Sequence, residues 1–167
     1  MTQPKTLGNR FYIGAGALVV SLTLLFSNVL ATASPAKVIS IIPPASGSTV
    51  MLNPNRIVDS RIDLSFPTYQ ASWSQDLQVA GRGGVPLNGV SAVILNVTAV
   101  NPQRSGYLTV WPFGIKRTAT SSLNFSAGQN IANTVIVRLS TDGTISLYNG
   151  SAGDVDILVD VEGYIPR

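Results

Sequence analysis

Acidic and β-branched residues alternate in the segment GDVDILVDVEGY, residues 153–164. In an extended strand, successive side chains point to opposite faces, so the carboxylates Asp154, Asp156, Asp160 and Glu162 share one face. Such a row could bind calcium, which takes several oxygen ligands, with Asp156 and Asp160 as the candidate ligands. The alternative is a solvated strand face in which one or two carboxylates pair with arginine.

Two carboxylates could also serve as the acid and base of a glycoside hydrolase, and Asp59, Asp156 and Asp160 are the candidates for that chemistry. Residues two apart on a strand are separated by only about 7 Å, and no Asx-rich metal loop accompanies the acidic row. The chain has no cysteine and no histidine, which removes thiolate nucleophiles, imidazole bases and the usual zinc ligands. We therefore expect a protein that is not an enzyme, with no required cofactor.

The segment RIVDSR, residues 56–61, places Asp59 and Arg61 on the same face of a strand as Ile57. An aspartate among apolar neighbours needs a partner, because burying an unpaired charge is costly. We predict a structural ion pair of Asp59 with Arg61, or with an arginine elsewhere. A ligand-binding role for the pair is the alternative.

The segment GYLTVWP, residues 106–112, combines aromatic and aliphatic residues on opposite strand faces. If the aliphatic face is the core, Tyr107 and Trp111 stand on the outer face, where their rings could stack on sugars. Trp73 is the third candidate for this ligand-binding surface. In the competing interpretation, the tryptophan fills the core or the end of a strand.

These side chains must be positioned by strands, because from Met51 onward short β-branched runs recur between turn residues and no helical spacing is sustained. The pattern predicts an all-β fold, an antiparallel β-sandwich of about eight strands. The turns TDGT (141–144) and NGSAGD (149–154) contain the Asp-Gly and Asn-Gly steps that favour tight hairpins. We therefore expect the last three strands to form a meander.

The N-terminus is predicted to direct export. Residues 1–33 form a hydrophobic signal helix with Lys5 and Arg10 at its start and a small-x-small cleavage motif at its end. An uncleaved membrane anchor is the alternative. Residues 34–49 are rich in Pro, Ser and Gly and predict a linker, and residues 50–167 form the β-sandwich domain. The expected location is extracellular or at the cell surface.

Charge is sparse along the chain. Charged residues make up 11%, and eleven Lys and Arg against eight Asp and Glu give a net charge of +3. Nucleic-acid binding needs a basic stripe or patch, so nucleic acid is not an expected partner. The expected partners are a polysaccharide, another cell-envelope polymer or a second copy of the chain, with membrane contact only through the N-terminal segment.

The ordered series of segments RIVDSR, VPLNGVSAVILNVTAVNP, GYLTVWP and SLYNGSAGDVDILVDVEGYI resembles a β-rich accessory domain family of exported bacterial surface proteins. Domains of that family occur in tandem copies or appended to secreted enzymes. The resemblance implies an accessory or adhesive module and carries over no ligand and no catalytic residue. This chain departs from the tandem arrangement because it has a single copy.

Two main functions follow from these observations. The first is an exported, non-catalytic β-sandwich module for surface attachment or carbohydrate binding. The second is a self-assembling surface or fibre subunit, in which exposed edge strands pair between copies. The hydrolase is a remote third alternative.

Overall fold

The computed structural model describes residues 47–63 and 65–167; the signal helix, the cleavage motif and most of the linker lie outside the described residues. The described part contains eight strands and no helix, which confirms the all-β prediction. No helix able to cross a membrane is found among these residues. The strands are β1 (Val50–Asp59), β2 (Ser74–Gln78), β3 (Val90–Val100), β4 (Gly106–Pro112), β5 (Leu123–Phe125), β6 (Ile131–Arg138), β7 (Thr144–Asn149) and β8 (Asp156–Pro166).

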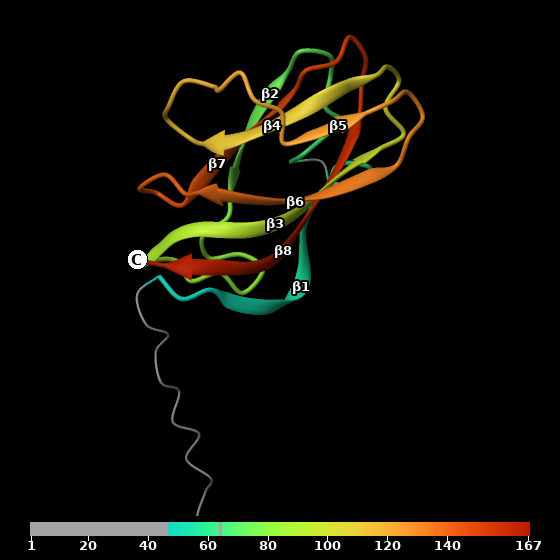
Figure 1. Cartoon of the computed structure of the whole chain (residues 1–167). Helices are drawn as coiled ribbons and strands as arrows, with labels where there is room; N and C mark the ends of the chain where they lie inside the picture. Colours follow the sequence, from blue (N-terminus) through green and yellow to red (C-terminus); the bar gives the residue numbers. More distant parts are fainter. Residues whose placement is uncertain (1–46, 64) are drawn as a thin grey trace, which may run out of the picture. The chain divides into compact units, whose positions relative to one another are not determined.

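The strands form two antiparallel sheets of four strands each, stacked as the predicted β-sandwich (Figure 1). The first sheet has the order β1-β8-β3-β6 and the second has the order β2-β7-β4-β5. Only β4 and β5 are both consecutive in the chain and paired with each other. Every other connection passes from one sheet to the other.

The predicted C-terminal meander is therefore wrong. Strands β6 and β8 belong to the first sheet, whereas β7 lies between β2 and β4 in the second. Gly143 adopts the positive φ expected of the Asp-Gly step, at +82°. A turn of this kind fixes only a local reversal of the chain. The apolar faces of the flanking strands decide which sheet each strand joins.

The connection between β7 and β8 is held by Asn149, whose side chain is fully buried. Its amide nitrogen donates hydrogen bonds to the carbonyl oxygens of Tyr69, Gln70 and Gly153, at 3.1, 3.0 and 2.8 Å. Its side-chain oxygen accepts hydrogen bonds from the backbone N–H and the hydroxyl of Ser151, at 3.0 and 2.8 Å. The Asn-Gly step that suggested a hairpin thus begins a crossover between sheets.

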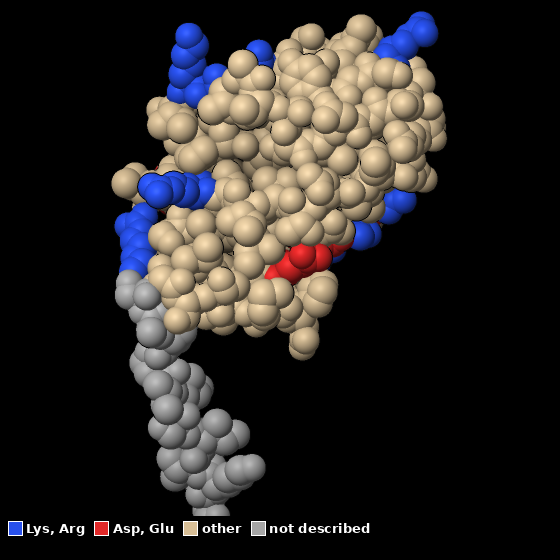
Figure 2. Space-filling model, in the orientation of Figure 1, with Lys and Arg blue, Asp and Glu red and all other residues tan. Residues whose placement is uncertain are grey.

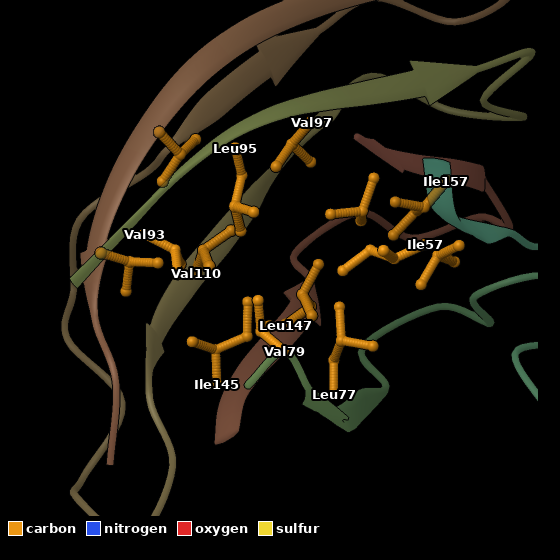
Figure 3. Packing of buried hydrophobic residues seen from close by; sticks show 14 of the residues in the cluster. Ile57, Leu77, Val79, Val93, Leu95, Val97, Val110, Ile145, Leu147 and Ile157 are labelled. Atoms are coloured by element: carbon orange, nitrogen blue, oxygen red, sulfur yellow. The ribbon is translucent and has the colours of Figure 1, made fainter. Parts of the chain in front are cut away.

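The core lies between the two sheets and is built from the alternating apolar faces that the sequence predicts. In β3, Val93, Leu95 and Val97 are fully buried and point toward the second sheet, where Val110 and Leu147 meet them (Figure 3). The core-facing residues of β8 are equally buried. They are Ile157, Val159 and Val161, and Val155, which comes just before the strand, is buried with them. Each such side chain contributes about 1.5–3 kcal/mol by leaving water.

Candidate functional site

Two tyrosines and an arginine gather on the outer face of the second sheet, and we name Tyr107, Tyr148 and Arg117 the tyrosine–arginine patch. The tyrosine ring centres are 6.2 Å apart with a 55° angle between the ring planes. The guanidinium carbon of Arg117 lies 3.5 Å from the centre of the Tyr148 ring, a cation–π contact. Both tyrosines are partly exposed and Arg117 is exposed, so the patch is accessible from solvent.

Strand geometry explains why these residues meet. Tyr148 in β7 stands opposite Thr109 in β4, and Tyr107 is two residues from Thr109, on the same face. The ring of Tyr107 lies directly on the backbone of Gly150, where an added Cβ would be 2.2 Å from the ring. The N–H of Gly150 also donates to the carbonyl of Tyr107, at 2.8 Å. Glycine at position 150 is therefore required for the position of Tyr107.

The patch presents hydrogen-bond donors with one positive charge. Hydrogen bonding to Arg117, and then to Ser72, lowers the pKa of the Tyr148 phenol. Guanidinium groups recognise carboxylate, phosphate and hydroxyl oxygens, and phenol groups can donate to the same atoms. The chemistry of the patch suits an oxygen-rich ligand better than a purely apolar one.

Trp111 was expected beside Tyr107 as an exposed ring, and that expectation is wrong. Trp111 does lie on the outer face, because Leu108 and Val110 are in the core as predicted. However, only 8% of Trp111 is exposed. Its indole N–H donates to the carbonyl of Ile115 at 3.2 Å, so the β4–β5 connection, residues 113–122, covers the ring.

Trp73 precedes Ser74, which pairs with Tyr148, but its ring is directed to the core rather than to the patch. Trp73 packs against the cluster of buried apolar residues between the sheets. Tyr107 and Trp111 do not belong to that cluster. The ring of Trp73 meets that of the buried Tyr69 edge-to-face, with centres 5.3 Å apart. Of the three aromatic residues proposed from the sequence, Tyr107 alone belongs to the patch.

The first sheet carries the ion pair expected in RIVDSR. The guanidinium of Arg61 donates to both carboxylate oxygens of Asp59, at 2.8 and 2.7 Å. Hydrogen bonding to Arg61 lowers the pKa of Asp59, and the charge of Arg56 acts in the same direction. Arg56 makes a second, two-bond pair with Asp160 at 2.8 and 3.1 Å, as expected in the interpretation in which one or two carboxylates of the acidic row pair with arginine.

The acidic row of β8 is split between different partners. Asp160 pairs with Arg56, whereas Asp156 accepts hydrogen bonds from the hydroxyls of Ser60 and Thr68, at 2.9 and 2.7 Å. Within residues 47–63 and 65–167, no three acidic, histidine or cysteine side chains come together as metal ligands. The structure therefore does not bring Asp156 and Asp160 together as a calcium site.

Charged residues are dispersed over the visible face of the described part. Lys and Arg occur singly or in small groups near its margins, and most of the face is uncharged (Figure 2).

No protein-family model matches the chain, and no curated protein matches it at a significant level.

Sequence reasoning missed Tyr148 and Arg117. The alternation in ISLYN (145–149) puts Tyr148 on the face opposite Ile145 and Leu147, which are buried, so its outward position can be inferred from the sequence. Its proximity to Tyr107 depends on the pairing of β7 with β4, which the predicted meander excluded. Arg117 lies in the β4–β5 connection. This segment has no periodic pattern from which the position of its side chains could be inferred.

Proposed function

We propose that this chain is an exported, non-catalytic module that attaches to a carbohydrate or another cell-envelope polymer through the tyrosine–arginine patch. The observation that carries the proposal is the stacking of Arg117 on Tyr148, with Tyr107 alongside, on an otherwise weakly charged sheet face. Aromatic rings with adjacent donors are suited to sugar rings and their oxygen substituents. The hydrophobic N-terminus and the resemblance to exported surface domains support the location.

A catalytic role has less support. Glycoside hydrolysis needs one carboxylic acid that stays protonated near neutral pH. The pKa of Asp59 is lowered instead, Asp160 is held by Arg56, and Asp156 accepts two hydroxyl hydrogen bonds. We expect an Asp156→Asn/Asp160→Asn double variant to release as much reducing sugar from polysaccharides as the native chain does. A loss of measurable hydrolysis in this variant would support a catalytic role.

The proposal is tested by a pull-down of the full chain on insoluble peptidoglycan, chitin and cellulose, with the bound fraction measured against polymer concentration. We expect saturable binding to at least one polymer. Arg117→Ala should weaken this binding at least ten-fold, because it removes the charged donor of the patch and its stacking contact.

The matched control is Lys116→Ala, which removes an equal charge from the neighbouring exposed position. Binding lost equally in both variants would indicate general charge attraction rather than the patch. Absence of saturable binding to all three polymers, or binding unchanged by Arg117→Ala, would contradict the proposal.

A further inference from the structure

Four strands form the edges of the two sheets, and three of them are protected against pairing with another chain. Strand β1 contains Pro54 and two irregularities in its register with β8. Strand β2 has five residues and carries Asp76, and β5 has only three residues. Short length, proline, bulges and charge are the usual means by which proteins block edge-to-edge association.

Strand β6 has none of these protections along most of its length. It has eight residues, IANTVIVR, and pairs with β3 without a break in register from Ala132 to Arg138. It contains no proline, and its single charge is Arg138 at the end of the strand. Edges of this kind are templates for a further strand.

The register shows which backbone groups of β6 face outward. The N–H of Leu139 donates to the carbonyl of Ser91, so this pair is hydrogen-bonded. In an antiparallel ladder, hydrogen-bonded and non-hydrogen-bonded pairs alternate. The positions whose N–H and C=O groups point away from β3 are therefore Ala132, Thr134, Ile136 and Arg138. Among the described residues, β6 pairs with no strand other than β3.

The side chains at these same four positions are exposed. Ile136 is the most apolar of them and is 65% exposed, beside its cross-strand neighbour Ile94. On the other side of the strand, the amide of Asn133 donates to the carbonyl of Ser122 at 2.7 Å and ties β6 to the β4–β5 connection. The strand is thus anchored, while its outer edge stays open.

We infer that β6 pairs antiparallel with β6 of a second copy of this chain, which joins two four-stranded sheets into one continuous sheet. The occupant is a second copy because the open positions are self-complementary under a two-fold axis. Placing Thr134 opposite the partner copy's Ile136 also places Ala132 opposite the partner copy's Arg138. All four open positions are then used, which gives about eight backbone hydrogen bonds.

The charges and apolar groups agree with this register. The two Arg138 side chains lie at opposite ends of the new ladder, so they do not face each other. The two Ile136 side chains become diagonal neighbours on the outer face, where each covers part of the other. The inference is independent of the polymer binding proposed above, since the tyrosine–arginine patch lies on the other sheet.

The test is sedimentation velocity of the full chain over a wide range of concentrations. We expect a species of twice the chain mass for the native protein and a single-chain species for Thr134→Pro. Proline is tolerated at position 134 because the N–H that it removes is not bonded to β3. Ile136→Lys should also give the single-chain species, through charge repulsion across the ladder and without any backbone change.

The matched control is Ile62→Lys, which introduces the same charge at an isoleucine that is 81% exposed and lies outside the strands. This variant should retain the doubled mass. Amide hydrogen exchange at Ile136 should be slow in the doubled species and fast in the Ile62→Lys/Thr134→Pro double variant. A native chain of single mass at all concentrations, or a doubled mass that persists in folded Ile136→Lys, would overturn the inference.

Discussion

Replacing Asn149 with alanine should be among the most damaging single changes outside the apolar core. The side chain is fully buried and hydrogen-bonds to the carbonyl oxygens of Tyr69 and Gln70, in the segment before β2, as well as to Ser151 and Gly153 within the β7–β8 crossover. Alanine removes all of these contacts while leaving the backbone conformation permitted. The variant therefore measures how much this polar cluster contributes to the fold.

The magnitude follows from which groups lose their last partner. The carbonyl of Tyr69 keeps a hydrogen bond from the N–H of Val155, and the carbonyl of Gly153 keeps one from the hydroxyl of Ser151. The carbonyl of Gln70 keeps the N–H of Trp73. The backbone N–H of Ser151 is left without an acceptor in the buried loop. The two Asn149 amide protons are shared by three carbonyl acceptors, so at most four bonds are lost. At about 1 kcal/mol each they set an upper value of about 4 kcal/mol, and the single orphaned donor sets a lower value of about 1–3 kcal/mol.

We expect the free energy of unfolding to fall by about 2–3 kcal/mol, since the hydrogen-bond losses are partly offset by the remaining donors. Urea denaturation followed by tryptophan fluorescence measures the difference, with the m-value as the check that the same surface is exposed. Asn124→Ala is the matched control, because Asn124 is an exposed strand asparagine and should change stability by less than about 0.5 kcal/mol. A loss below about 1 kcal/mol in Asn149→Ala at an unchanged m-value would refute the account of the crossover.

Two further predictions concern the ion pair and the covered tryptophan. Because Arg61 lowers the pKa of Asp59 in the folded chain, the pair stabilises the fold above the unfolded pKa of about 4, and this contribution is lost as pH falls through the lower folded pKa. Asp59→Asn should therefore flatten the acid side of the stability curve, and an unchanged curve from urea titrations at several pH values would count against the pair. Trp111→Phe removes the indole donor and should cost about 1 kcal/mol while speeding proteolysis within residues 113–122; unchanged cleavage there would mean that the loop is held by other contacts.

Much of the fold could be predicted because alternation is a local property. The alternation in VILNV (93–97) is enough to assign Val93, Leu95 and Val97 to one face, which the structure buries, and the same rule applies to the apolar residues of β8. The order of strands in the sheets could not be predicted in this way. An Asp-Gly or Asn-Gly step reverses the chain equally well into a hairpin or a crossover, and the choice depends on contacts distant in sequence, such as those of Asn149.

In the candidate site, as in the fold, contacts between residues close in sequence could be predicted and contacts between distant residues could not. Asp59 and Arg61 are two residues apart, so their pairing is local and predictable, although Arg61 lies in the turn after β1 rather than in the strand. The pairing of Arg56 with Asp160 spans 104 residues and depends on β1 lying next to β8. The outward face of Trp111 was predicted correctly, but the loop that covers it has no periodicity from which its path could be inferred.

The central position of β8 in the first sheet has a consequence for the order of folding. Strand β8 lies between β1 and β3, so these two strands share a neighbour that is synthesised after both of them. Any process that delivers the chain from its N-terminus, whether synthesis or passage through a membrane pore, leaves β1 without a pairing partner until residues 156–166 arrive. Pairing between strands so distant in sequence slows folding, because the entropy cost of closing the long loop comes before the stabilising contacts form. The β1 edge of the first sheet can therefore form only after β8 is available, whereas β3 and β6 can pair before it.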